Sequence, residues 1–113
     1  MPLAAHHVRA LVAELASPTA RERELAAEKV VDWLPGIDPS SAAAISRALE
    51  LVLTFEESEV ALESQLNALC EISSHGPVPQ DVIARVVSVR SWDQPWAKEY
   101  IDGLRDDLPI APK

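Results

Sequence analysis

Acidic and polar residues recur at four-residue intervals in three stretches of the chain, and this spacing could build a charged binding surface. Residues four apart lie on the same face of a helix, so each stretch would present one row. If three such helices lie side by side, the nine side chains form a patch with seven carboxylates and one ammonium group. The rows are Glu24, Glu28 and Asp32, then Glu63, Asn67 and Glu71, and finally Lys98, Asp102 and Asp106.

This acidic patch has two interpretations. Like charges four residues apart destabilise a helix by roughly a few tenths of a kcal/mol, so a chain that keeps them can be using their field to attract a basic protein. Alternatively, the rows are solvated helix faces that Arg21, Arg23 and Lys29 partly neutralise. Both interpretations stay open on the sequence, and the first defines the predicted partner-binding site.

The histidines and the cysteine lack the spacing of a metal or catalytic site. Neighbouring helix residues point about 100° apart, so His6 and His7 cannot both bind one ion comfortably. The chain has no Cys-x-x-Cys or His-x-x-x-His motif and no glycine-rich phosphate loop. Cys70 falls on an apolar helix stripe, which favours a buried thiol over a nucleophile. We therefore expect no metal, no cofactor and no enzymatic activity.

For two other groups of residues, we expect a structural role rather than a functional one. The acidic run at 56–59 precedes a predicted helix, where negative charge would offset the helix dipole. Aromatic side chains can seal the end of a core or anchor an interface, and we expect the sealing role here. The heavy aromatics are Trp33, Trp92, Trp96 and Tyr100.

Length and charge limit the possible functions. The chain has 113 residues and a formal charge of −8, which suits one domain, expected over 1–108 with a flexible tail at 109–113. Nucleic acids and anionic membranes attract basic surfaces, so both are disfavoured as partners. A basic protein is the natural complement of such a chain, although its acidity could also serve only to prevent association.

Cysteine content and the N-terminal sequence favour the cytoplasm. A single cysteine excludes an internal disulfide framework. The start of the chain lacks a basic region followed by an apolar one, so we expect no signal peptide, and no run of about 18 apolar residues predicts a membrane helix. Arginine exceeds lysine seven to three and alanine is abundant, a composition that would fit a GC-rich bacterial genome.

Apolar residues at helical spacing predict six helices that would position the acidic rows. Their predicted ranges are 4–15, 18–34, 42–54, 58–73, 80–89 and 96–106. Ser17 is the expected N-cap of the second helix, and Ser40 or Ser41 opens the third. Leu51, Val52 and Leu53 are among the expected core residues. The run 51–55 could pass for a strand, but only a short stretch near Val86 could pair with it, so a helix is preferred.

The sequence also indicates an internal repeat of about 38 residues. Sliding the chain by this interval aligns 7–11 with 45–49 and 83–87, so that Arg9, Arg47 and Arg85 coincide. The second helices align similarly, with 27–32 over 66–71. A single helical hairpin cannot bury its apolar flanks, so the repeats would have to stack.

This pattern, over about 4–107, resembles HEAT-like repeats, and its most family-like stretch is 17–34. The resemblance implies an all-α fold of three antiparallel hairpins, stacked as a short right-handed superhelix whose second helices line a concave binding face. We therefore predict a protein-binding module, in its most specific form a small bacterial immunity protein that neutralises a basic toxin. The alternatives are a scaffold or adaptor subunit of a larger complex, a fragment of a longer array, or an enzyme subunit or small-molecule binder with a pocket between helices.

Overall fold

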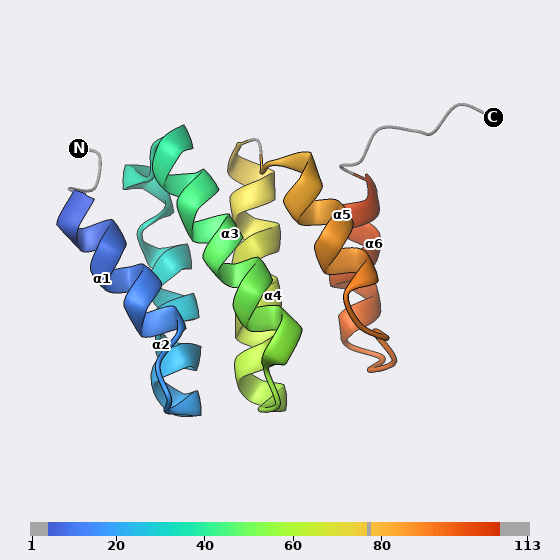
Figure 1. The fold of residues 1–113 in the computed structure, drawn as a ribbon. Coiled ribbons are helices and arrows are strands. Elements are labelled where there is room, and N and C mark those ends of the chain that lie inside the picture. Colours follow the sequence, from blue (N-terminus) through green and yellow to red (C-terminus); the bar gives the residue numbers. More distant parts are fainter. Residues whose placement is uncertain (1–4, 77, 107–113) are drawn as a thin grey trace.

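The structure, a computed structural model, describes residues 5–76 and 78–106, which form six α-helices joined by short turns (Figure 1). No strand occurs in these ranges, so the all-α prediction is confirmed and residues 51–55 belong to a helix. The predicted tail at 109–113 lies outside the described residues. The elements are α1 (Ala5–Leu15), α2 (Ala20–Asp32), the 3-10 turn η1 (Leu34–Gly36), α3 (Pro39–Phe55), α4 (Glu59–His75), α5 (Gln80–Ser88) and α6 (Ala97–Asp106).

The helices alternate in direction and form two layers (Figure 1). In one layer α3 packs against both α1 and α5, and in the other α4 packs against both α2 and α6. Each helix of the first layer also packs against the helix that follows it in the chain. The helices that carry the predicted acidic rows therefore lie side by side, as a shared surface requires.

Apolar side chains fill the space between the two layers. The residues that are at most 3 % exposed include Leu11, Leu15, Val30, Ile45, Leu49, Leu53, Leu62, Leu66, Leu69, Val82, Val86, Ile101 and Leu104. Most of them occupy helical spacings of three and four, which is why periodicity identified them. Leu66 is completely buried on α4, the helix at the centre of its layer.

Leu51 is a wrong core prediction, because its side chain is 62 % exposed. Ile45, Leu49 and Leu53 recur every four residues and turn one face of α3 into the core. Leu51 lies two residues from Leu49, which places it about 160° away around the helix axis. The neighbouring Val52 is half-buried.

Side-chain caps set the starts of two helices. The Asp38 carboxylate accepts a hydrogen bond from the backbone N–H of Ser41 at 2.8 Å, so α3 starts at Pro39, earlier than predicted. Ser58 Oγ accepts from the N–H of Ala61 at 3.3 Å and caps α4, as its predicted start requires.

The predicted Ser17 cap of α2 is wrong, since Thr19 occupies the N-cap position without a side-chain bond. The Ser17 hydroxyl instead donates to the Glu22 carboxylate at 2.6 Å and accepts from the Thr19 N–H at 3.2 Å. Ser17 therefore orders the turn before the helix rather than its first amide groups.

The heavy aromatics are half-buried and pack against the core. Trp92 Nε1 donates to the Val86 carbonyl at 2.9 Å, and Trp96 Nε1 donates to the Glu59 carboxylate at 3.0 Å. Trp96 and Tyr100 also meet edge to face, with ring centroids 6.3 Å apart. These contacts attach the Trp92 loop to α5 and join Trp96, just before α6, to the start of α4. The sealing role stays a prediction. No helix in the described ranges is long and apolar enough to cross a bilayer.

Candidate protein-binding surface

The rows predicted on the second and fourth helices meet on one exposed surface. A hollow of about 250 Å³ between α2 and α4 is lined by Glu28, Val31, Asp32, Ser64 and Asn67. Glu28 and Asp32 are exposed, and Asn67 is half-buried beside them. Three of the predicted site residues therefore share one hollow. We call the exposed surface around Glu28, Asp32, Glu63, Asn67 and Glu71 the α2–α4 face.

The carboxylates of the α2–α4 face are not neutralised by the described part of the chain. Within 5–76 and 78–106, none of the lysines and arginines forms an ion pair with Glu28, Asp32, Glu63 or Glu71. The cations of α2 pair elsewhere: Arg21 pairs with Glu24 at 3.0 Å and Lys29 with Glu14 at 2.8 Å. Glu24, also predicted as a site residue, is therefore the neutralised end of its row.

The third row is partly neutralised within its own helix. Lys98 Nζ lies 3.0 Å from Asp102, and Arg105, which the row did not include, lies 3.8 Å from the same carboxylate. Asp106 is exposed at the end of α6. The negative potential of the predicted patch is therefore concentrated on α2 and α4, while Asp102 is compensated within α6.

Glu63 connects the α2–α4 face with α6. Burial raises the pKa of the Tyr100 phenol, and the nearby Glu63 carboxylate raises it further. The phenol therefore keeps its proton and can donate to the carboxylate near neutral pH. Glu63 is exposed, so its remaining acceptor positions face solvent.

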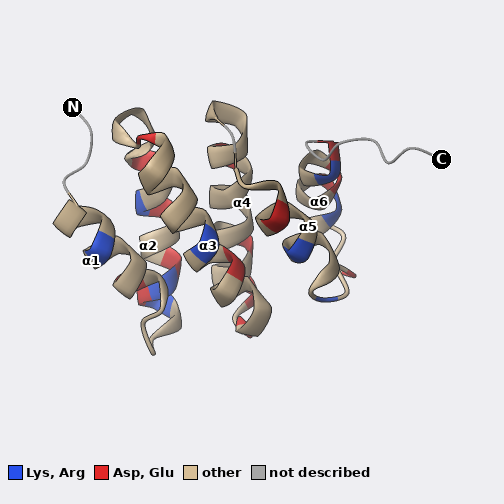
Figure 2. Ribbon diagram, turned by 45° about the horizontal axis from the view of Figure 1, so that its top comes forward, with Lys and Arg blue, Asp and Glu red and all other residues tan. Residues whose placement is uncertain are grey.

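In the opposite layer, basic and acidic residues lie near one another on α3 and α5 (Figure 2). Arg47 of α3 lies 3.1 Å from Asp81 of α5, and Arg85 of α5 lies 2.7 Å from Glu50 of α3. Hydrogen bonds from Arg47 and then Arg85 lower the pKa of Asp81. Two of the three arginines aligned by the predicted repeat thus join α3 to α5, while Arg9 is exposed on α1.

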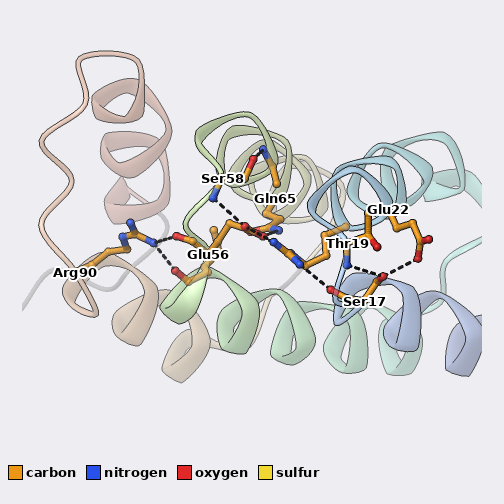
Figure 3. Close-up of polar contacts among 10 residues, drawn as sticks. Ser17, Thr19, Glu22, Glu56, Ser58, Gln65 and Arg90 are labelled. Atoms are coloured by element: carbon orange, nitrogen blue, oxygen red, sulfur yellow. Dashed lines mark hydrogen bonds and ion pairs between the residues drawn. The ribbon is translucent and has the colours of Figure 1, made fainter.

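A buried carboxylate lies at the edge of the molecule where the turns within the hairpins are found (Figure 1). Glu56, between α3 and α4, has a side chain with no exposed area, and it receives Arg23 Nε and Nη2 at 2.7 and 2.8 Å (Figure 3). Gln65 Nε2 donates to the same carboxylate at 2.6 Å, and the Ser58 N–H donates at 3.1 Å. Burial raises the pKa of Glu56, but the bonds from Arg23, Gln65 and Ser58 outweigh it and lower the pKa to about 2.

Three further hydrogen bonds extend this cluster to all three hairpins. Arg23 Nη1 donates to the Ser17 carbonyl at 2.7 Å, and Arg90 Nη1 donates to the carbonyls of Leu53 and Glu56 at 3.0 and 2.9 Å (Figure 3). We call Ser17, Arg23, Glu56, Gln65 and Arg90 the Glu56 junction. Sequence reasoning gave Glu56 the dipole role of its acidic neighbours and missed the junction, because Arg23 lies 33 residues away.

The histidines and Cys70 contact neighbouring rings and backbone carbonyl oxygens. His6 and His7 are exposed on α1 with ring centroids 4.0 Å apart, and His75 Nδ1 lies 2.9 Å from the Glu71 carbonyl oxygen. Cys70 is half-buried rather than fully buried, and its thiol lies 3.5 Å from the Tyr100 carbonyl oxygen. In the described residues, no three His, Cys, Asp or Glu side chains are grouped closely enough to hold a metal ion.

Comparison of the chain with known protein families, with curated proteins and with solved structures gives no match. Any function must therefore be argued from the fold and the surface chemistry described above.

Proposed function

We propose that this protein is a non-enzymatic binding module that recognises a basic protein through the α2–α4 face. The observation that carries the proposal is the hollow in which Glu28 and Asp32 lie together without an ion pair from the described cations. Glu24, Asp102 and Asp106 would extend the contact at its rim, where two of the three are already compensated.

The hollow suits a lysine or arginine side chain of a partner. Glu28 and Asp32 would accept hydrogen bonds from its cationic head, the Asn67 amide oxygen adds a third acceptor, and Val31 offers apolar contact to its methylene stem. Because the chain carries a formal charge of −8, its field would also steer a basic partner toward the complex and raise the association rate.

In its most specific form, the proposal is a small immunity protein that blocks a basic toxin in the cytoplasm. Carboxylates on α2 and α4 would occupy a cationic active site and exclude its substrate. The resemblance to HEAT-like repeats supports this version, since it implies a binding face lined by the second helices. The acidic composition supports it as well.

The second candidate is a scaffold or adaptor subunit of a larger complex. A separate apolar groove at one end of the molecule favours it, because an adaptor needs more than one binding surface. An immunity protein needs only the α2–α4 face.

A charge-reversal pair tests the proposal. The partner is captured from the native cell by cross-linking, identified by mass spectrometry and purified. Its affinity is then measured at low and high salt for E28K/D32K and for a control, D93K/E99K, which changes the net charge equally on the α5–α6 hairpin.

We expect E28K/D32K to weaken binding at least about tenfold at low salt and to reduce the salt dependence, because contacts at the interface are removed. The control should retain most of the affinity. Equal losses in both variants would show that only net charge matters, and unchanged affinity in E28K/D32K would remove the α2–α4 face from the binding site.

A further inference from the structure

An apolar groove lies where the end of α1 approaches the last turns of α3. It has a volume of about 350 Å³, at the small end of the range of ligand pockets. That size suits one or two anchoring side chains of a protein partner rather than a large cofactor. The lining residues are Ala16, Ser17, Arg23, Leu51, Val52, Phe55, Glu56 and Glu57.

Two large apolar side chains stand exposed in this groove. Leu51 is 62 % and Phe55 is 73 % exposed, and they lie four residues apart on the same face of α3. Neither side chain is needed to complete the core, because Leu49 and Leu53 already turn the other face of α3 inward. Aromatic and aliphatic side chains in such a position are typical anchors of an interface.

The floor of the groove is held by the Glu56 junction. Arg23 and Glu56 line the groove and are fixed to each other by two hydrogen bonds. Arg90 holds the backbone at the end of α3 through the carbonyls of Leu53 and Glu56. A preformed surface of this kind loses little conformational entropy on binding.

The charged groups that line the groove limit the kinds of partner that it could bind. The Glu56 carboxylate is compensated by Arg23, whereas Glu57 is exposed and no ion pair within 5–76 and 78–106 involves it. A partner therefore meets an apolar wall beside one uncompensated carboxylate. A second copy of this chain would bring another acidic rim and a formal charge of −8, which disfavours self-association through this groove.

We propose that this groove docks a segment of another protein that inserts a large apolar side chain beside Leu51 and Phe55 and places a lysine or arginine next to Glu57. The groove is separate from the α2–α4 face and does not depend on the function proposed for that face. It would give the molecule two distinct binding surfaces.

Synthetic peptides test the chemistry directly. The probe is a helical peptide of about 15 residues with Leu at two positions four apart and Lys beside them, and it is titrated into the ¹⁵N-labelled protein. Matched peptides replace both Leu by Ala, or the Lys by Glu. We expect saturable NMR shifts centred on Ala16, Leu51, Phe55 and Glu57 with the first peptide, and much weaker binding by the other two.

Surface variants locate the binding site. F55S should weaken peptide binding at least about fivefold, as expected for an anchor. E57Q should weaken binding of the Lys peptide by about two- to fivefold and leave a Gln-substituted peptide unaffected. V60S, which changes a residue 61 % exposed outside the groove, and E28K/D32K should both retain affinity.

Several results would overturn the proposal. These are the absence of saturable shifts, tight binding of the Ala peptide, or equal effects of F55S and V60S. Sedimentation that shows a dimer dissociated by F55S would assign the groove to a second copy instead. Loss of peptide binding in E28K/D32K would mean that the peptide binds the acidic α2–α4 face and not the groove.

Discussion

Glu56 and Glu28 carry the same side chain in opposite surroundings. The Glu56 side chain has no exposed area and receives bonds from Arg23, Gln65 and the Ser58 amide. Glu28 is exposed in a shallow hollow, and no described cation pairs with it. The difference shows that compensated charges join helices, whereas carboxylates without an ion pair from the described cations lie at the surface, where the proposed partner would meet them.

Removing the buried carboxylate should have the largest effect. E56A would leave the Arg23 guanidinium without its partner at a mostly buried site, which is expected to cost about 3–5 kcal/mol of the free energy of unfolding. Urea denaturation followed by circular dichroism measures the change. The matched variant E28A should alter stability by less than about 0.5 kcal/mol. Similar losses of unfolding free energy in the two variants would show that Glu56 and Glu28 do not differ in their contribution to the fold.

A truncation in the apolar core provides a reference for the stability loss expected of E56A. Leu66 is completely buried on α4, so L66A should cost about 2–5 kcal/mol through lost burial and a residual cavity. The same urea titration applies. If L66A were nearly neutral, α4 would not present this face to the core, and the orientation of Glu63 and Asn67 on the same helix would also be in doubt.

Acid should weaken the Glu56 junction. The pKa of Glu56 is about 2 in the folded chain against an ordinary value of 4.5, so the unfolded chain takes up the proton first as the pH falls. The stabilisation is complete above about pH 4.5 and is lost between about 4.5 and 2, with a magnitude of up to about 3 kcal/mol.

Stability measured against pH for the wild type and for E56Q isolates this contribution, because other acidic groups titrate in both proteins. The E56Q curve should fall less steeply between pH 4.5 and 2. Parallel curves would show that the proton uptake comes from other carboxyl groups.

Reversing a charge on the α2–α4 face should have the smallest effect on stability. E28K removes an uncompensated carboxylate from solvent-exposed helix surface, so the free energy of unfolding should change by less than about 0.5 kcal/mol. Thermal denaturation at low and high salt measures the change. A loss of several kcal/mol would mean that Glu28 supports the fold, which would contradict its assignment to partner binding.

The sequence predicts the helices well, because they follow local periodicity, and the same periodicity places the residues of each acidic row on one helix. The binding role of these rows stays a prediction. Helix ends differ by a few residues where a cap such as Asp38 outcompetes nearby serines. The pairing of Arg105 with Asp102 also has a local signal, since the two residues lie three apart on one helix. The internal repeat, the handedness of the helical stack and the single-domain boundary stay predictions.

The Glu56 junction and the apolar groove could not be predicted in the same way. Arg23 and Glu56 are brought together only by the packing of α2 against α4, and no local pattern marks a pair 33 residues apart. Leu51 was expected in the core because its neighbours are apolar, although the four-residue spacing of Ile45, Leu49 and Leu53 already places it on the other face of α3. No local pattern shows that the end of α1 lies beside Leu51 and Phe55 and forms a groove with them.

The location of the Glu56 junction also affects the shape of the surface that a partner meets. Successive hairpins are linked covalently at one edge of the molecule, whereas the junction bonds them at the opposite edge, where the turns within each hairpin lie (Figure 1). Restraint at both edges would limit changes in the angle between neighbouring hairpins. The spacing between α2 and α4, and with it the fit of a bound cation, would therefore depend on buried residues that a partner on the α2–α4 face never contacts.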